Sequence, residues 1–138
     1  DLLARLLAAP NPDSYLGEGL TLQRSLADYL HELLAAKGLK RADVYRASGL
    51  NSTVVYDAFS GKSRLGRDNA LMVAFGLGCS LRETQRLLKL AGAAELYPKV
   101  RRDAIIIWCI DRGMSREACD DELWRFGEKT LLGTCPLQ

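Results

Sequence analysis

Histidine, paired cysteines and long apolar runs are scarce in this 138-residue sequence, and each shortage excludes a class of protein. The only histidine is His31, and the four cysteines, Cys79, Cys109, Cys119 and Cys135, form no C-x-x-C pair. A protein zinc site needs several such ligands at fixed spacing, so no metal site is expected and His31 should lie at the surface. No segment approaches the ~20 apolar residues of a membrane span, so we expect no membrane partner.

Catalytic patterns and strand patterns are missing as well. The sequence has no nucleophile with a histidine partner and no glycine loop that could cradle a phosphate. Asp120, Asp121 and Glu122 are consecutive, so on a helix they point in different directions and do not form an acid/base pair. We therefore expect neither an enzyme nor a cofactor. Because alternation at period two is absent throughout, the chain is predicted to be all-α.

The cysteines and the first residues bear on the cellular compartment. Residues 2–9 are apolar, but Arg5 interrupts them and the stretch is too short for a signal peptide. Unpaired thiols are typical of a reducing compartment, so a cytoplasmic location is predicted. The chain begins at Asp1 rather than methionine, so we expect its natural start to lie upstream.

The net charge of +2 hides an uneven distribution of basic residues. Residues 38–68 contain six basic and three acidic side chains, and residues 69–110 again contain six and three. Both ends are acidic, with three basic against five acidic residues in 1–37 and four against six from 111 onward. A basic middle flanked by acidic ends favours a polyanionic partner more than the total charge does.

What the sequence does contain is helical periodicity punctuated by glycine. Leucines recur with helical spacing between Leu22 and Leu34, which predicts a helix over 25–37 that Gly38 ends. Further helices are expected over the first ten residues, over 67–77, over 80–92 and after Ser115, while 11–19 is expected to be a turn-rich linker. Gly76 should weaken the 67–77 helix slightly.

The stretch from Leu39 to Arg64 predicts two short helices joined at Gly49, which tolerates a positive φ. In the second helix Val55 and Phe59 are four residues apart and should face inward. An outward stripe then remains at i, i+4 and i+8, which consists of Ser52, Tyr56 and Ser60.

This stretch resembles the helix-turn-helix of lambda-repressor-like (XRE family) transcriptional regulators. The resemblance rests on the helix-Gly-Leu turn, the N-S-T start of the second helix and its A-F-S-G-K end. It implies an all-α, five-helix helix-turn-helix domain over 21–92, preceded by an N-terminal helix and linker over 1–20. The stretch R-L-L-K-L-A-G with L-Y-P-K-V-R-R-D-A is similar to a recurring extension of bacterial XRE-type proteins. This suggests a helical extension over 93–138 that packs on the same domain or dimerises.

The resemblance implies sequence-specific binding of double-stranded DNA, with residues 52–60 in the major groove. The side chains expected to face bases are Asn51, Ser52, Thr53 and Tyr56. Those expected to face phosphates are Lys40, Arg41, Ser60, Lys62, Arg64 and Arg67. Asp57 on the outward side and the absence of arginine or glutamine there support an alternative, a helical adaptor that binds proteins and not DNA. The sequence points to no particular small-molecule effector.

Seven consecutive apolar residues, 104–110, are too many for one buried helix face. Symmetric dimers present two reading helices to DNA, so a homodimer is predicted through this segment. The alternative is that Leu123, Trp124 and Phe126 cover it within one chain. The residues placed at the dimer contact or in the core are Ile105, Ile106, Ile107 and Trp108.

Overall fold

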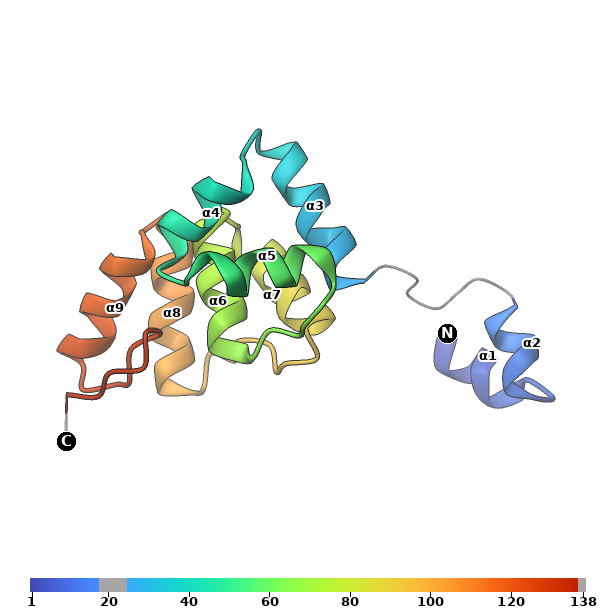
Figure 1. The fold of residues 1–138 in the computed structure, drawn as a ribbon. Helices are drawn as coiled ribbons and strands as arrows, with labels where there is room; N and C mark the ends of the chain where they lie inside the picture. Colours follow the sequence, from blue (N-terminus) through green and yellow to red (C-terminus); the bar gives the residue numbers. More distant parts are fainter. Residues whose placement is uncertain (18–24, 137–138) are drawn as a thin grey trace.

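The computed structural model describes residues 1–17 and 25–136 of the chain (Figure 1). These residues form nine α-helices and no β-strand, which confirms the all-α class for the part described. Leu22, the first leucine of the predicted periodic run, lies outside the described residues. The helices are α1 (Leu2–Ala8), α2 (Pro12–Leu16), α3 (Leu26–Ala36), α4 (Arg41–Ser48), α5 (Ser52–Ser60), α6 (Arg67–Gly76), α7 (Leu81–Leu90), α8 (Arg101–Asp111) and α9 (Arg116–Arg125).

Serine caps begin three of these helices. Ser25, Ser80 and Ser115 each accept the backbone N–H of the residue three positions on, at 3.1, 3.2 and 3.0 Å. Such caps satisfy N–H groups that have no partner inside the helix, which is why α3, α7 and α9 start where the sequence predicted.

The N-terminal segment contains one helix that the sequence analysis did not predict. Residues 12–16, expected to be part of a linker, form α2. Asn11 caps it by accepting the N–H of Ser14 at 2.8 Å, and Pro12 occupies the first helical turn, where its fixed φ is favourable. The preceding helix, α1, buries none of its residues.

One hydrophobic core extends from α3 to the segment after α9. It contains the inner faces of the predicted helix-turn-helix region and also those of α8 and α9. Figure 1 shows α8 and α9 side by side next to α6, and α8 also contacts α7. Ile106, Cys109 and Leu123 of this extension are fully buried, so it shares the core of the preceding helices.

Helices α4 and α6 pack closely against each other at Gly76. A Cβ added there would lie 2.6 Å from the carbonyl oxygen of Val44 and 3.1 Å from the Cβ of Ser48. Gly76 was expected only to weaken its helix. Its position shows instead that the missing side chain makes room for the backbone of α4.

None of the described helices is both long enough and apolar enough to cross a bilayer.

Candidate nucleic-acid interface

Helix α5 separates an apolar inner face from a polar outer face. Val55, Ala58 and Phe59 are at most 1% exposed. The nitrogen Nε2 of His31 on α3, which is exposed, donates to the carbonyl oxygen of Phe59 at 2.9 Å and ties the end of α5 to the bundle. The outer face therefore has a fixed orientation relative to the core.

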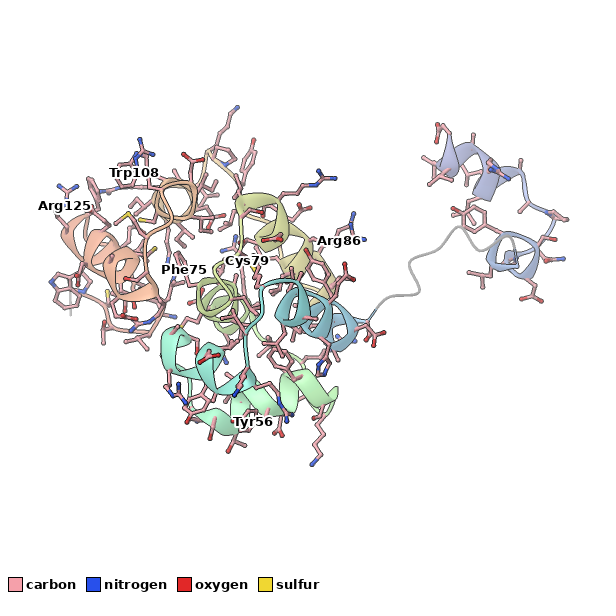
Figure 2. The ribbon with its side chains drawn as sticks, turned by 90° about the horizontal axis from the view of Figure 1, so that it is seen from above. Tyr56, Phe75, Cys79, Arg86, Trp108 and Arg125 are labelled. Atoms are coloured by element: carbon pink, nitrogen blue, oxygen red, sulfur yellow. The ribbon has the colours of Figure 1, made fainter. Side chains whose placement is uncertain are left out.

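The predicted base-facing residues lie along this outer face. Thr53 and Tyr56 are exposed and Ser52 is half-buried. The side-chain oxygen of Asn51 caps α5 by accepting the N–H of Val54 at 2.9 Å, which leaves its amide NH₂ group to contact a ligand. Figure 2 shows Tyr56 on the outside of the bundle, away from Trp108.

Tyr56 is held by two residues of α4. Its ring meets that of Tyr45 edge to face, with centroids 6.0 Å apart, and the guanidinium carbon of Arg41 lies 5.1 Å from its centroid. Stacking of this kind orients a guanidinium without neutralising it. The structure thus brings a predicted base-facing residue, Tyr56, into direct contact with a predicted phosphate-facing residue, Arg41, and adds a neighbour, Tyr45, that was not predicted.

The turn before α5 is compact and touches the C-terminal extension. Gly49 has a φ of +85°, a conformation that side chains disfavour. A Cβ at Gly49 would also lie 2.7 Å from the Nε of Arg116, which comes from α9 and is 8% exposed. Ser48 closes the turn from inside, because its hydroxyl accepts the N–H of Leu50 at 3.1 Å.

The predicted phosphate-facing lysines and arginines divide into two groups. Lys40, Arg41, Lys62 and Arg64 are exposed, and none forms an ion pair with another described residue. Ser60 is exposed too, although its hydroxyl donates to the carbonyl oxygen of Asp57 at 3.1 Å.

Arg67, by contrast, does not belong with this exposed group. Its terminal nitrogens donate to both carboxylate oxygens of Asp103, at 3.0 and 2.8 Å. Its Nε donates to the carbonyl oxygen of Ala94 at 2.9 Å, and a terminal nitrogen also donates to that of Glu95 at 3.2 Å. The hydrogen bonds with Asp103 raise the pKa of Arg67 above its ordinary value, and the guanidinium is occupied within the fold.

Lys62 and Arg64 line a hollow of about 400 Å³ at the end of α5. Lys89 of α7 lines the same hollow, and Ser25 lies at its edge. The sequence analysis did not select Lys89, although the positive balance of residues 69–110 was a signal for it.

The arginines of the C-terminal extension form a contrast, because each has a carboxylate partner. The closest N–O distances run from 2.6 Å for the Arg116–Asp120 pair to 3.7 Å for Arg112 with Asp111. The arginines paired in this way are Arg101, Arg102, Arg112, Arg116 and Arg125. Arg41 and Arg64, which have no such partner among the described residues, lie instead in the predicted helix-turn-helix part.

Asp57 is the acidic exception on α5. It is half-buried, and its carboxylate forms neither an ion pair nor a hydrogen bond with another described residue. Next to phosphate it would repel, whereas next to a cytosine amino group it would accept a hydrogen bond.

The apolar segment of α8 is split between core and surface. Ile106 is fully buried and Ile105 and Ile107 are partly buried, while Trp108 remains 47% exposed. The guanidinium of Arg112 lies over the Trp108 ring at 3.9 Å. Ile105, Trp108 and Phe126 line an apolar hollow of about 340 Å³ between α8 and α9.

The cysteines show no sign of reactive or ligand chemistry. Cys79, Cys109 and Cys119 are buried free thiols, and burial raises the pKa of Cys79 to about 12. Within the described residues, no three histidine, cysteine or acidic side chains come close enough to hold a metal ion.

Comparison of the chain with protein-family models, with curated proteins and with solved structures finds no match.

Proposed function

We propose that this protein binds double-stranded DNA in a sequence-specific way, as a lambda-repressor-like transcriptional regulator. Helix α5 would enter the major groove, which is about 12 Å wide and admits one helix. The observation that carries the proposal is the distribution of ion pairs. Four cations around α5, namely Lys40, Arg41, Lys62 and Arg64, have no carboxylate partner among the described residues, while every arginine of α8 and α9 has one.

Each group has a separate task in this arrangement. Lys40, Arg41, Lys62 and Arg64 bind phosphates and fix the register of α5, without reading sequence themselves. Thr53 and Tyr56 then meet base edges. Arg41 also supports base reading indirectly. Its guanidinium contacts the Tyr56 ring and so fixes this base-facing side chain relative to a phosphate-binding one.

Duplex affinity should fall steeply with salt. Each phosphate contact adds about 0.9 to the slope of log affinity against log salt, so these four cations predict a slope of about −3 to −4 per subunit. Changing Lys62→Ala should flatten the slope by nearly one unit and weaken binding to all sequences alike. Fluorescence titration of labelled duplex at several salt concentrations measures both quantities.

Two matched variants control this experiment. Thr53→Ala removes no charge, so the slope should stay unchanged while preference among sequences drops by about 1–2 kcal/mol at the base it reads. Lys99→Ala removes an exposed charge from the segment before α8 and should change neither quantity. A flat salt response from folded wild-type protein would end the proposal and favour the adaptor alternative.

We also propose that two copies associate through the outer face of α8. Trp108 and Phe126, 47% and 41% exposed, flank the hollow there together with Ile105. Figure 2 shows Trp108 away from Tyr56, so a dimer of this kind leaves both α5 helices accessible.

Light scattering coupled to size-exclusion chromatography tests the dimer. The wild-type protein should elute with twice the mass of one chain at micromolar concentration, and Trp108→Ser should shift it to the monomer. Trp124→Ser is the matched control, because Trp124 is 50% exposed but does not line the hollow. A monomeric wild-type protein, or equal effects of the two variants, would contradict this interface.

A further inference from the structure

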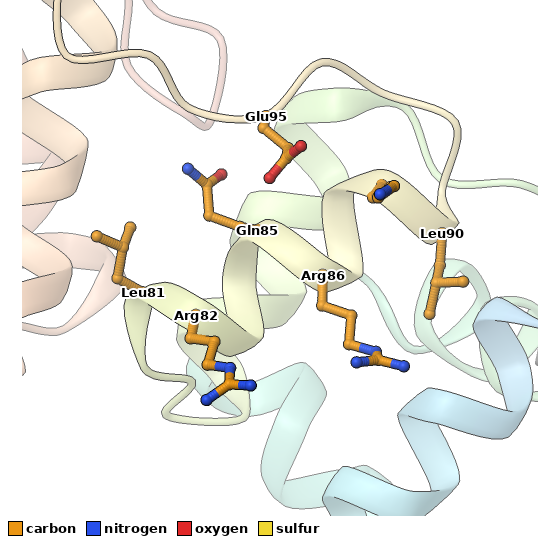
Figure 3. A pocket seen from close by; sticks show the side chains of 7 residues that line it. Leu81, Arg82, Gln85, Arg86, Leu90 and Glu95 are labelled. Atoms are coloured by element: carbon orange, nitrogen blue, oxygen red, sulfur yellow. The ribbon is translucent and has the colours of Figure 1, made fainter. Parts of the chain in front are cut away.

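Helix α7 presents a second basic surface, which adjoins the hollow beside α5 at Lys89. Its inner face is formed by Thr84, Leu87 and Leu88, all fully buried. Its outer face carries three exposed cations at i, i+4 and i+7, which places them on one stripe about 10.5 Å long. We call these residues, Arg82, Arg86 and Lys89, the α7 stripe (Figure 3 labels Arg82 and Arg86).

The charge of the α7 stripe is not neutralised within the described chain. None of its three cations forms an ion pair there. The nearest acid along the helix, Glu83, is already committed, because it binds Lys37 at 3.0 Å and accepts the N–H of Ser80 at 2.9 Å. The guanidinium of Arg86 lies 5.6 Å from the ring centroid of Tyr29, a contact that leaves its charge unpaired.

A hollow of about 690 Å³ adjoins the α7 stripe. Leu81 and Leu90 lie at its two ends, and Gln85 lies between them (Figure 3). Both polar atoms of the Gln85 amide hydrogen-bond with the backbone of Leu96: the oxygen accepts its N–H at 2.7 Å, and the nitrogen donates to its carbonyl oxygen at 2.9 Å. The hollow is therefore lined by the three cations of the α7 stripe as well as by Leu81 and Leu90, with Glu95 at the side away from the α7 stripe.

These features fit a protein partner better than a second stretch of duplex. Leu81 and Leu90 would gain nothing beside a phosphate backbone, but they would contact an apolar side chain. The Glu95 carboxylate would repel phosphate on the far side of the hollow. Figure 2 also places Arg86 on a different side of the bundle from Tyr56, so a straight duplex on α5 would not cover both.

We propose that the α7 stripe and its hollow form a docking site for an acidic amphipathic helix of a partner protein. One apolar side chain of that helix would enter the hollow between Leu81 and Leu90. Carboxylates spaced like the α7 stripe itself would pair with Arg82, Arg86 and Lys89. This site does not depend on DNA binding, and the two surfaces could be occupied together.

The test uses two synthetic helical peptides that differ only in charge. One carries glutamate at i, i+4 and i+7 on the edge of a leucine face, and the other carries glutamine at those positions. Fluorescence anisotropy with the full chain should show saturable binding of the glutamate peptide, at least tenfold tighter than that of the glutamine peptide. The double variant Arg82→Gln/Arg86→Gln should weaken binding by about four- to twenty-five-fold, since each exposed ion pair contributes a factor of about two to five.

Three controls make the outcomes distinct. Arg82→Gln alone should weaken binding about two- to fivefold, and it leaves the Arg86–Tyr29 contact intact if the double variant proves less stable. Lys99→Gln, an exposed cation outside α7, should leave peptide binding unchanged. Leu90→Ser should weaken binding of the glutamate peptide, because it removes one aliphatic side chain that lines the hollow.

A duplex titration separates this site from the DNA surface. Lys89 lines both this hollow and the one beside Lys62 and Arg64, so the double variant leaves Lys89 in place. Duplex affinity should then be unchanged by the double variant while peptide affinity falls. Equal affinity for the two peptides, or peptide binding that Arg82→Gln/Arg86→Gln leaves intact, would overturn the site. Loss of duplex binding in the double variant as large as that in Lys62→Ala would assign the α7 stripe to DNA instead.

Discussion

Replacing Asp103 with asparagine should lower the free energy of unfolding by about 3 kcal/mol. The side chain is 3% exposed and accepts hydrogen bonds from Arg67 and from the backbone N–H of Tyr97, the latter at 3.0 Å. Asparagine has the same size but no charge, so the guanidinium of Arg67 would keep its position with its charge uncompensated. Because the Arg67 side chain is 28% exposed, water relieves part of the penalty, and the loss should lie at the low end of that expected for a broken buried pair.

The same variant should change how stability depends on pH. Burial raises the pKa of Asp103, but the hydrogen bonds from Arg67 and Tyr97 outweigh it and hold the pKa below the ordinary value of 3.8. A carboxyl group whose pKa is lowered by folding stabilises the protein at pH values above that ordinary value. This contribution is lost as the pH falls through the folded-state pKa. Urea unfolding from about neutral pH down to about pH 3 should therefore show a smaller acid-dependent loss in Asp103→Asn than in the wild type.

Asp121→Asn is the matched control. Asp121 also belongs to the C-terminal extension, but its side chain is exposed. Its free energy of unfolding should stay within about 0.5 kcal/mol of the wild type. A loss below about 1 kcal/mol in Asp103→Asn would mean that the Arg67–Asp103 pair contributes no more than a surface ion pair.

Changing Gly76→Ala should lower the free energy of unfolding by about 1 kcal/mol. Alanine stabilises a helix by about 1 kcal/mol relative to glycine, so helix propensity alone predicts that the variant is more stable. The added Cβ, however, would lie 2.6 Å from the carbonyl oxygen of Val44, a backbone atom that moves only if α4 moves. Overpacking of this kind costs about 1–3 kcal/mol and should exceed the gain in propensity.

Urea unfolding of Gly76→Ala and Gly66→Ala distinguishes sterics from backbone effects. A Cβ at Gly66 would meet no atom within 4 Å. Because alanine is a weaker N-cap than glycine, Gly66→Ala should lower the free energy of unfolding only through the cap of α6, by about 1 kcal/mol or less. Stabilisation of Gly76→Ala would show that α4 yields to the added methyl group at little cost.

The helices were predictable because their signals are local. Serine caps, leucine periodicity and glycine stops all act within a few residues, and α3 to α7 and α9 begin close to the expected positions. Even α2, which the analysis missed, carries a local signal, because Asn11 caps the helix and Pro12 occupies its first turn.

The parts that could not be predicted depend on contacts between distant residues. From the sequence, Arg67 was expected to bind phosphate. In the structure Asp103, on a helix of the extension, binds its guanidinium instead. Gly76 was expected only to weaken its helix, but the backbone of α4 lies against it. The count of apolar residues in 104–110 did not reveal that Ile106 would face the core and Trp108 the outside, because that depends on the side from which neighbouring helices approach.

The contact between Arg116 and the turn at Gly49 bears on how such a chain could be rearranged. A C-terminal segment can be exchanged between proteins most easily when it has its own core and makes few contacts with the rest of the chain. Here, a foreign segment grafted after Gly92 would arrive without Arg116 and would leave the space beside the Gly49 turn open. The part proposed to read DNA and the helices that follow it are therefore matched to each other, and recombination between them would have to replace both partners at once.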